Sequence, residues 1–122
     1  MPPLRWPAIL AGILVSALTA IATHALVGPA TTAVASLFGL AVGGFVAGKS
    51  ANSAGAYHGA VVGAGFIVLE ALGVIPTAGY AGDAFADTLQ VIVLDGAALL
   101  SSTLGGALSS RIASSSDRGR DR

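Results

Sequence analysis

The chain contains no cysteine and very few charged residues. Of its 122 residues, 10% are Asp, Glu, Lys or Arg, whereas soluble domains average about 25%. The absence of thiols excludes disulfides, thiolate metal sites and cysteine chemistry, and the scarcity of charge argues against an ordinary soluble domain. With 54% hydrophobic residues and 17 glycines spread over long uncharged runs, the composition is typical of a multi-pass helical membrane protein.

Charged side chains are also balanced in sign, with six basic and six acidic residues. No polybasic field predicts binding to nucleic acid. The sequence shows neither a nucleophile with a paired base nor a metal-ligand spacing, so we expect no metal, no cofactor and no enzymatic activity. Residues 43–50 match the phosphate-loop pattern G-x-x-x-x-G-K-[ST]. That motif works only between a strand and a helix, and here it lies at the end of an apolar run.

Breaks in the apolar runs divide the chain into four segments. No charged residue occurs between Trp6 and Gly48, and Gly28-Pro29 is the clearest helix breaker within that run. We therefore predict an all-α membrane protein with one domain, residues 1–113, and transmembrane helices at about 7–27, 30–48, 54–75 and 86–112. The polar segment 114–122 is predicted to be a disordered cytoplasmic tail.

The basic residues predict how these helices cross the membrane. Arg5 precedes the first span, Lys49 lies between the second and third, and Arg111 lies at the end of the fourth. Because cytoplasmic loops carry the excess of Lys and Arg, these topology determinants predict two antiparallel hairpins with both termini in the cytoplasm, in a plasma (inner) membrane.

Glycines recur at four-residue spacing, as in a glycine zipper, so that they line single faces of the predicted helices. Such faces let helix backbones approach closely, and in lipid this van der Waals contact must supply much of the association energy. We expect the faces of the second and third spans to pack against each other. The predicted packing glycines are Gly39, Gly43, Gly44, Gly48, Gly55, Gly59, Gly63, Gly105 and Gly106.

Two acids within the predicted spans stand out, because a carboxylate near the bilayer centre costs a few kcal/mol. Glu70 and Asp95 both fall in the outer half of the membrane, and His24 lies near the outer end of the first span. If these three converge, they form a candidate proton or cation site. The alternative is that the acids are hydrated at the outer interface, or are protonated and bonded to neighbouring backbone or hydroxyl groups.

Two glycine-rich stretches carry a family resemblance. VGGFVAGKSA over residues 42–51 and YHGAVVG over residues 57–63 resemble the YrzE-like family of small membrane proteins. Those proteins typically read Gly-Gly-[aromatic or Ile]-x-Ala-x-[Lys/Arg], followed by a bulky residue and His-Gly-x-x-x-Gly. The resemblance implies a four-span prokaryotic membrane protein and no particular activity.

Two functional hypotheses remain from the sequence. The first is a structural or interaction protein that acts by glycine-mediated helix packing, with the lipid bilayer, a second copy of itself or another membrane protein as its partners. The second is a small proton- or cation-coupled transporter or channel that uses Glu70, Asp95 and His24.

Overall fold

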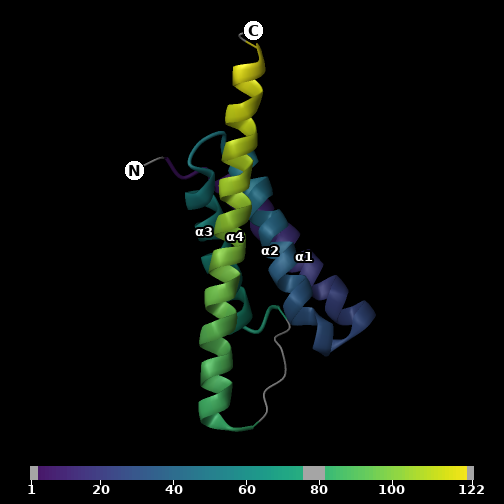
Figure 1. The fold of residues 1–122 in the computed structure, drawn as a ribbon. Helices are drawn as coiled ribbons and strands as arrows, with labels where there is room; N and C mark the ends of the chain where they lie inside the picture. The colour runs from purple at the N-terminus through teal and green to yellow at the C-terminus, as the bar shows by residue number, and fades with distance from the viewer. Residues whose placement is uncertain (1–2, 76–81, 121–122) are drawn as a thin grey trace.

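In residues 3–75 and 82–120, which the computed structural model describes, all regular structure is helical. The helices are α1 (Trp6–Val27), α2 (Pro29–Ala51), α3 (Gly55–Ala71) and α4 (Ala84–Arg120) (Figure 1). Three segments are long and apolar enough to cross a membrane: Trp6–Val27, Thr31–Ala51 and Ala84–Ser115. The predicted all-helical class is confirmed, and three of the four predicted spans correspond to helices that are long and apolar enough to cross a membrane.

The third helix is shorter than predicted. It has 17 residues, or about 26 Å at 1.5 Å per residue, against a hydrocarbon core of about 30 Å. It ends at Ala71 instead of residue 75, because Gly73 has φ +72°. The Gly73 N–H donates to the carbonyl of Glu70, and the Val74 N–H to that of Leu69. These two bonds form a Schellman motif, which closes a helix with glycine in the left-handed conformation.

The fourth helix is longer than predicted. It continues through Arg120, so the expected disorder from residue 114 is wrong for residues 114–120; residues 121–122 lie outside the described part of the chain. No proline interrupts this stretch. The Ser114 and Ser115 hydroxyls donate to the carbonyls of Arg111 and Ile112, one turn earlier, which satisfies them without leaving the helix. The 37 residues of α4 span about 55 Å.

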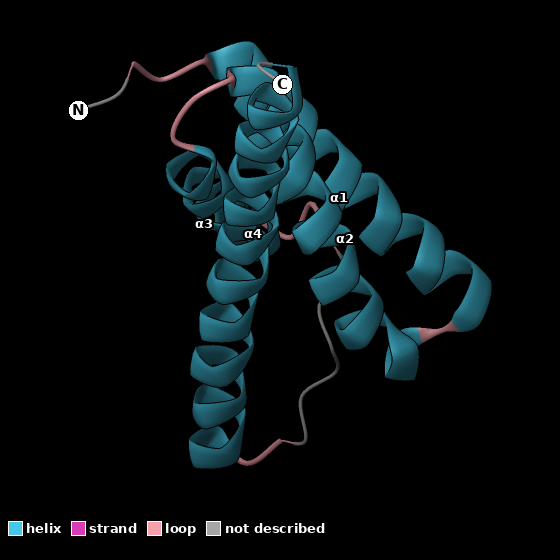
Figure 2. Ribbon diagram, turned by 45° about the horizontal axis from the view of Figure 1, so that its top comes forward, coloured by secondary structure: helices cyan, strands magenta, loops and turns pink. Residues whose placement is uncertain are grey.

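The pairs of helices that pack together also differ from the expectation. Helix α2 packs extensively against both α1 and α4, and α3 packs more against α4 than against α2. Helix α4 is therefore the principal partner of α3. Helices α1 and α2 lean away from α4 towards the turn at Gly28, so the bundle is wedge-shaped (Figures 1 and 2).

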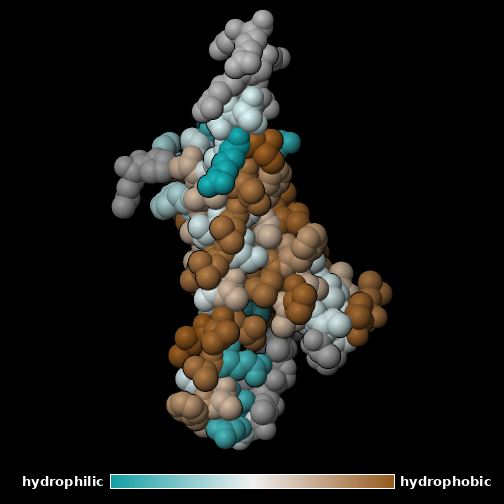
Figure 3. Space-filling model, in the orientation of Figure 1, coloured by the Kyte–Doolittle hydropathy of each residue, from teal (hydrophilic) through white to brown (hydrophobic). Residues whose placement is uncertain are grey.

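Two small clusters of buried apolar side chains form the interior. One joins all four helices and the turn after α3, and the other lies nearer Arg5. Their members are Ala20, Leu40, Phe66, Ile75 and Ala98 in the first, and Ile9, Ala47 and Val62 in the second. Most of the larger apolar side chains lie on the outside instead, as Figure 3 shows in brown, which is the distribution expected of helices that face lipid.

Candidate functional site

Each of the nine packing glycines predicted from the sequence faces another helix. A Cβ at Gly39 or Gly43 would meet α1, and one at Gly44 or Gly48 would meet α4. The three predicted glycines of α3 face α4 as well, while Gly105 faces α2 and Gly106 faces α3. The glycines of α2 and α3 were predicted to pack against each other; instead Gly44 and Gly48 of α2 and the three glycines of α3 converge on the same stretch of α4, around Ser102 and Gly106.

We call the contact of α2 and α3 with α4 the glycine seam. Ser102 and Gly106 lie at its centre. Side chains built at Gly44 and at Gly59 would both clash with the Ser102 carbonyl, and one at Gly55 would clash with the Gly106 carbonyl. The backbones are therefore in direct contact. Polar bonds reinforce the seam at Ser101, whose hydroxyl donates to the carbonyl of Leu37 at 2.6 Å. A hydroxyl-to-carbonyl bond between helices is among the polar contacts that stabilise helix association in lipid.

The basic topology determinants gather at one end of the bundle. Arg5 precedes α1, Lys49 lies in the last turn of α2, and Arg111 follows the α4 turn whose Ser110 hydroxyl accepts the Gly55 N–H. All three side chains are exposed. We call this the basic end.

His58 is fully buried near the basic end. Its Nε2 accepts the backbone N–H of Arg5 at 3.3 Å, and its Nδ1 lies 3.1 Å from the carbonyl of Ala54. Since a carbonyl only accepts, Nδ1 carries the proton and the ring is neutral. His58 thereby ties the start of α1 to the start of α3.

The three candidate proton or cation residues lie towards the other end. Glu70 is in the last turn of α3 and Asp95 is on α4; both are partly buried, and the two acids interact electrostatically. His24 is further away, because α1 and α4 do not pack against each other over the described residues. Its Nδ1 lies 3.3 Å from the Thr32 hydroxyl of α2. The structure therefore places the two acids on neighbouring helices, α3 and α4, and places His24 against Thr32 of α2.

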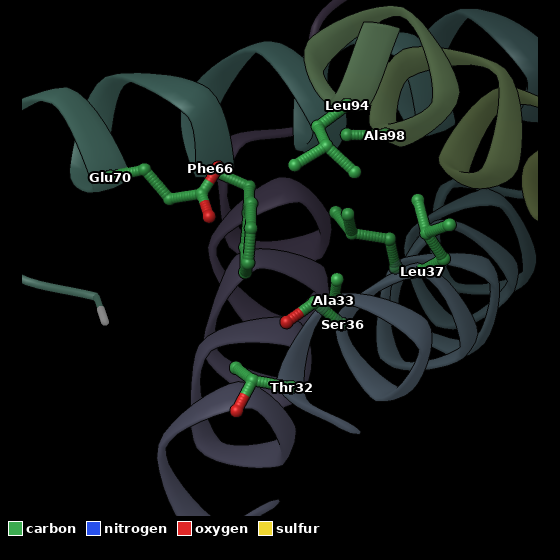
Figure 4. A pocket seen from close by; sticks show the side chains of 9 residues that line it. Thr32, Ala33, Ser36, Leu37, Phe66, Glu70, Leu94 and Ala98 are labelled. Carbon is green, nitrogen blue, oxygen red and sulfur yellow. The ribbon is translucent and has the colours of Figure 1, made fainter. Parts of the chain in front are cut away.

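Glu70 lines a cavity of about 30 Å³ between α2, α3 and α4. Figure 4 shows the side chains that surround it, with Glu70 and Phe66 on α3 and two hydroxyls on α2. A water molecule needs about 10–15 Å³ of such volume, so the cavity has room for about two. Its lining consists of Thr32, Ala33, Ser36, Leu37, Leu40, Phe66, Glu70, Leu94 and Ala98.

Sequence reasoning missed Thr32 and Ser36 as members of this site. Both are small hydroxyl residues spaced by one helical turn, so they share a face of α2. Thr32 is buried and donates to the Gly28 carbonyl at 2.9 Å. Their four-residue spacing was the available signal, but it is indistinguishable from the small-residue spacing that serves packing alone.

The residues described show no group of three or more His, Asp or Glu side chains placed to hold a metal ion. Comparison of the chain with protein-family models, with curated proteins and with solved structures found no match.

Proposed function

We propose that this chain is a non-enzymatic, multi-pass protein of a prokaryotic plasma membrane that acts as a structural or interaction protein. The observation that carries the proposal is the glycine seam, in which α2 and α3 contact the backbone of α4. Such contact supports a rigid scaffold whose apolar outer faces remain for lipid, for a second copy or for another membrane protein. The resemblance to the YrzE-like family remains a prediction.

In the membrane, we propose that the helices form two antiparallel hairpins with the basic end in the cytoplasm. The segment that contains α3 also crosses the membrane, which gives four spans in all. Helix α4 is longer than the hydrocarbon core, so its last turns extend beyond it. Single cysteines introduced at Ser50 and Ser115, both exposed, test this in a background without native thiols. We expect a membrane-impermeant maleimide to label them only after permeabilisation, and to label a cysteine at exposed Ala86 in intact cells.

The scaffold proposal is tested by oligomeric mass in native lipid nanodiscs. We expect wild type to run as an assembly larger than the 11.9 kDa monomer, and Gly44→Ile and Gly59→Ile to lose both fold and assembly. Gly96→Ile is the matched control, because a Cβ there would meet nothing within 4 Å. Assembly that survives in the two seam variants would refute glycine packing as its basis.

A second candidate function, proton- or cation-coupled transport, is favoured by one specific observation. The Glu70 carboxyl lines a cavity with hydroxyl residues, and a second acid lies beside it. The test is flux into proteoliposomes for wild type and for the Glu70→Gln, Asp95→Asn double variant. Flux that is unchanged in the double variant would remove this candidate.

A further inference from the structure

We propose that the cavity beside Glu70 is a binding site for a small monovalent alkali cation such as sodium, held by oxygen atoms of Glu70, Ser36 and Thr32. The inference rests on the second candidate function and specifies the ligand class of that site. It starts from the electrostatics of the carboxyl group and from the hydroxyl groups that share the cavity.

Glu70 occupies an unfavourable position for an isolated carboxylate. It lies in the last turn of α3, where its carbonyl accepts the Gly73 N–H, and a helix C-terminus carries partial negative charge. Asp95 adds a second acid on the facing helix α4. The described arginines and Lys49 do not offset this charge, because they lie at or beyond the basic end, on the far side of the bundle from the last turn of α3. A bound cation would neutralise the site.

Ser36 supplies an independent indication of a ligand. Its side chain is 7% exposed and lines the cavity (Figure 4). Its hydroxyl forms no hydrogen bond with any residue in the described ranges, although buried polar groups are almost always paired. Over the described residues, every fully enclosed side-chain nitrogen or oxygen has a partner, so the unpaired Ser36 oxygen is not fully enclosed and is open on the side of the cavity that Ser36 lines. A ligand there would complete its bonding.

The third oxygen comes from Thr32, which already donates its proton to the Gly28 carbonyl. The lone pairs of the Thr32 hydroxyl oxygen remain available to His24 Nδ1, 3.3 Å away, and to a ligand in the cavity. The lining thus offers one carboxylate and two hydroxyl oxygens, a set suited to hard cations. A volume of about 30 Å³ accommodates one ion with a water molecule, and the single lining carboxylate matches a single positive charge.

Titratable groups around the carboxyl are Asp95 on α4 and, beyond Thr32, His24 on α1. They are relevant because a proton competes with an alkali ion for the Glu70 carboxylate. Sodium binding and carboxyl protonation are therefore measured on the same samples. Sodium binding is followed by calorimetry of the full chain in nanodiscs, and protonation by the infrared carboxyl band across a pH titration.

We expect Glu70→Gln to weaken sodium binding on the order of tenfold to a hundredfold, since an ionised acceptor is lost. Ser36→Ala should weaken it several-fold. Asp83→Asn is the matched control, because it removes a charge at the exposed start of α4, where Asp83 accepts the Phe85 and Ala86 N–H bonds and Asn caps equally well. Each variant is first shown to have the unfolding transition of wild type.

Sodium binding that depends on Glu70 and Ser36 supports the proposal. A carboxyl band that titrates without any sodium binding shows that Glu70 only exchanges a proton, and it overturns the proposal, as does sodium binding that Glu70→Gln leaves unchanged. Cation binding without flux would support the cation site and rule out transport. Failure of the transport function is therefore distinguishable from failure of the cation site.

Discussion

The contact between Gly44 and Ser102 yields the most quantitative prediction of the structure. A Cβ at Gly44 would lie 2.8 Å from the Ser102 carbonyl carbon and 3.0 Å from its Cα. Carbon atoms pack at about 3.5–4.0 Å, so Gly44→Ala requires α2 and α4 to separate by about 0.7 Å or more. A gap of this size forfeits a quarter to a half of the dispersion energy of the atoms that face it.

Two opposing terms set the size of the effect. Alanine gains about 1 kcal/mol over glycine in a helix interior, whereas overpacking a tight contact costs about 1–3 kcal/mol in total. At Gly96 only the favourable term operates, because nothing lies within 4 Å of the added carbon. We therefore expect Gly44→Ala to lower the free energy of unfolding and Gly96→Ala to raise it, with the two variants differing by about 2–4 kcal/mol.

The assay is SDS-induced unfolding in mixed micelles, followed by energy transfer between dyes. The dyes are attached to cysteines introduced at Leu10 on α1 and Leu104 on α4, which are 60% and 62% exposed. Labelling is specific because the chain has no native cysteine. Equal unfolding free energies for Gly44→Ala and Gly96→Ala would refute the reasoning, since the two substitutions add the same methyl group and differ only in what that group meets.

Three further predictions concern other contacts. Gly73→Ala should cost about 1–2 kcal/mol in the same unfolding assay, because alanine is strained at φ +72° in otherwise open space, and Gly73→Asn should cost less; equal costs would contradict the Schellman ending. His58→Leu should cost about 1–3 kcal/mol, because it leaves the Arg5 N–H without its acceptor, and an unchanged stability would show that this bond does not hold α1. Cysteines at Leu37 and Ser101 should cross-link within one chain under mild oxidation, since the Ser101 hydroxyl reaches the Leu37 carbonyl at 2.6 Å; failure to cross-link would place α2 and α4 in another register.

The sequence was sufficient to predict the ends of helices that are set by local residues. Gly28-Pro29 marks the turn between α1 and α2 because proline suits only the first turn of a helix. The end of α3 was predicted at residue 75, just before a proline in the sequence, whereas Gly73 ends the helix earlier through its left-handed conformation. The continuation of α4 past residue 112 was missed because polar composition was taken as disorder, although serines can bond within a helix.

The sequence could not show which helices pack together, because a row of glycines indicates only that another backbone approaches closely. The faces of α2 and α3 are joined by a short connection, which favoured their mutual packing. In the structure, α4 offers Ser102 and Gly106, small residues whose carbonyls contact glycines of α2 and of α3 at once. Small residues on α4 therefore let two helices approach its backbone closely at one place.

The position of the candidate site follows from where the backbone contacts through glycine stop. Near the basic end, backbone meets backbone at Gly55 and Gly106, so the helices are held as close as their main chains allow. Further along, small residues such as Ser36 and Ala98 stand beside large ones such as Phe66 around the cavity, and the helices diverge (Figure 2). Side chains of unequal size do not fill a widening gap completely, and Glu70 lines the space that is left. Because the seam sets the distance between these helices, substitutions that loosen it should alter cation binding at a distance without touching Glu70.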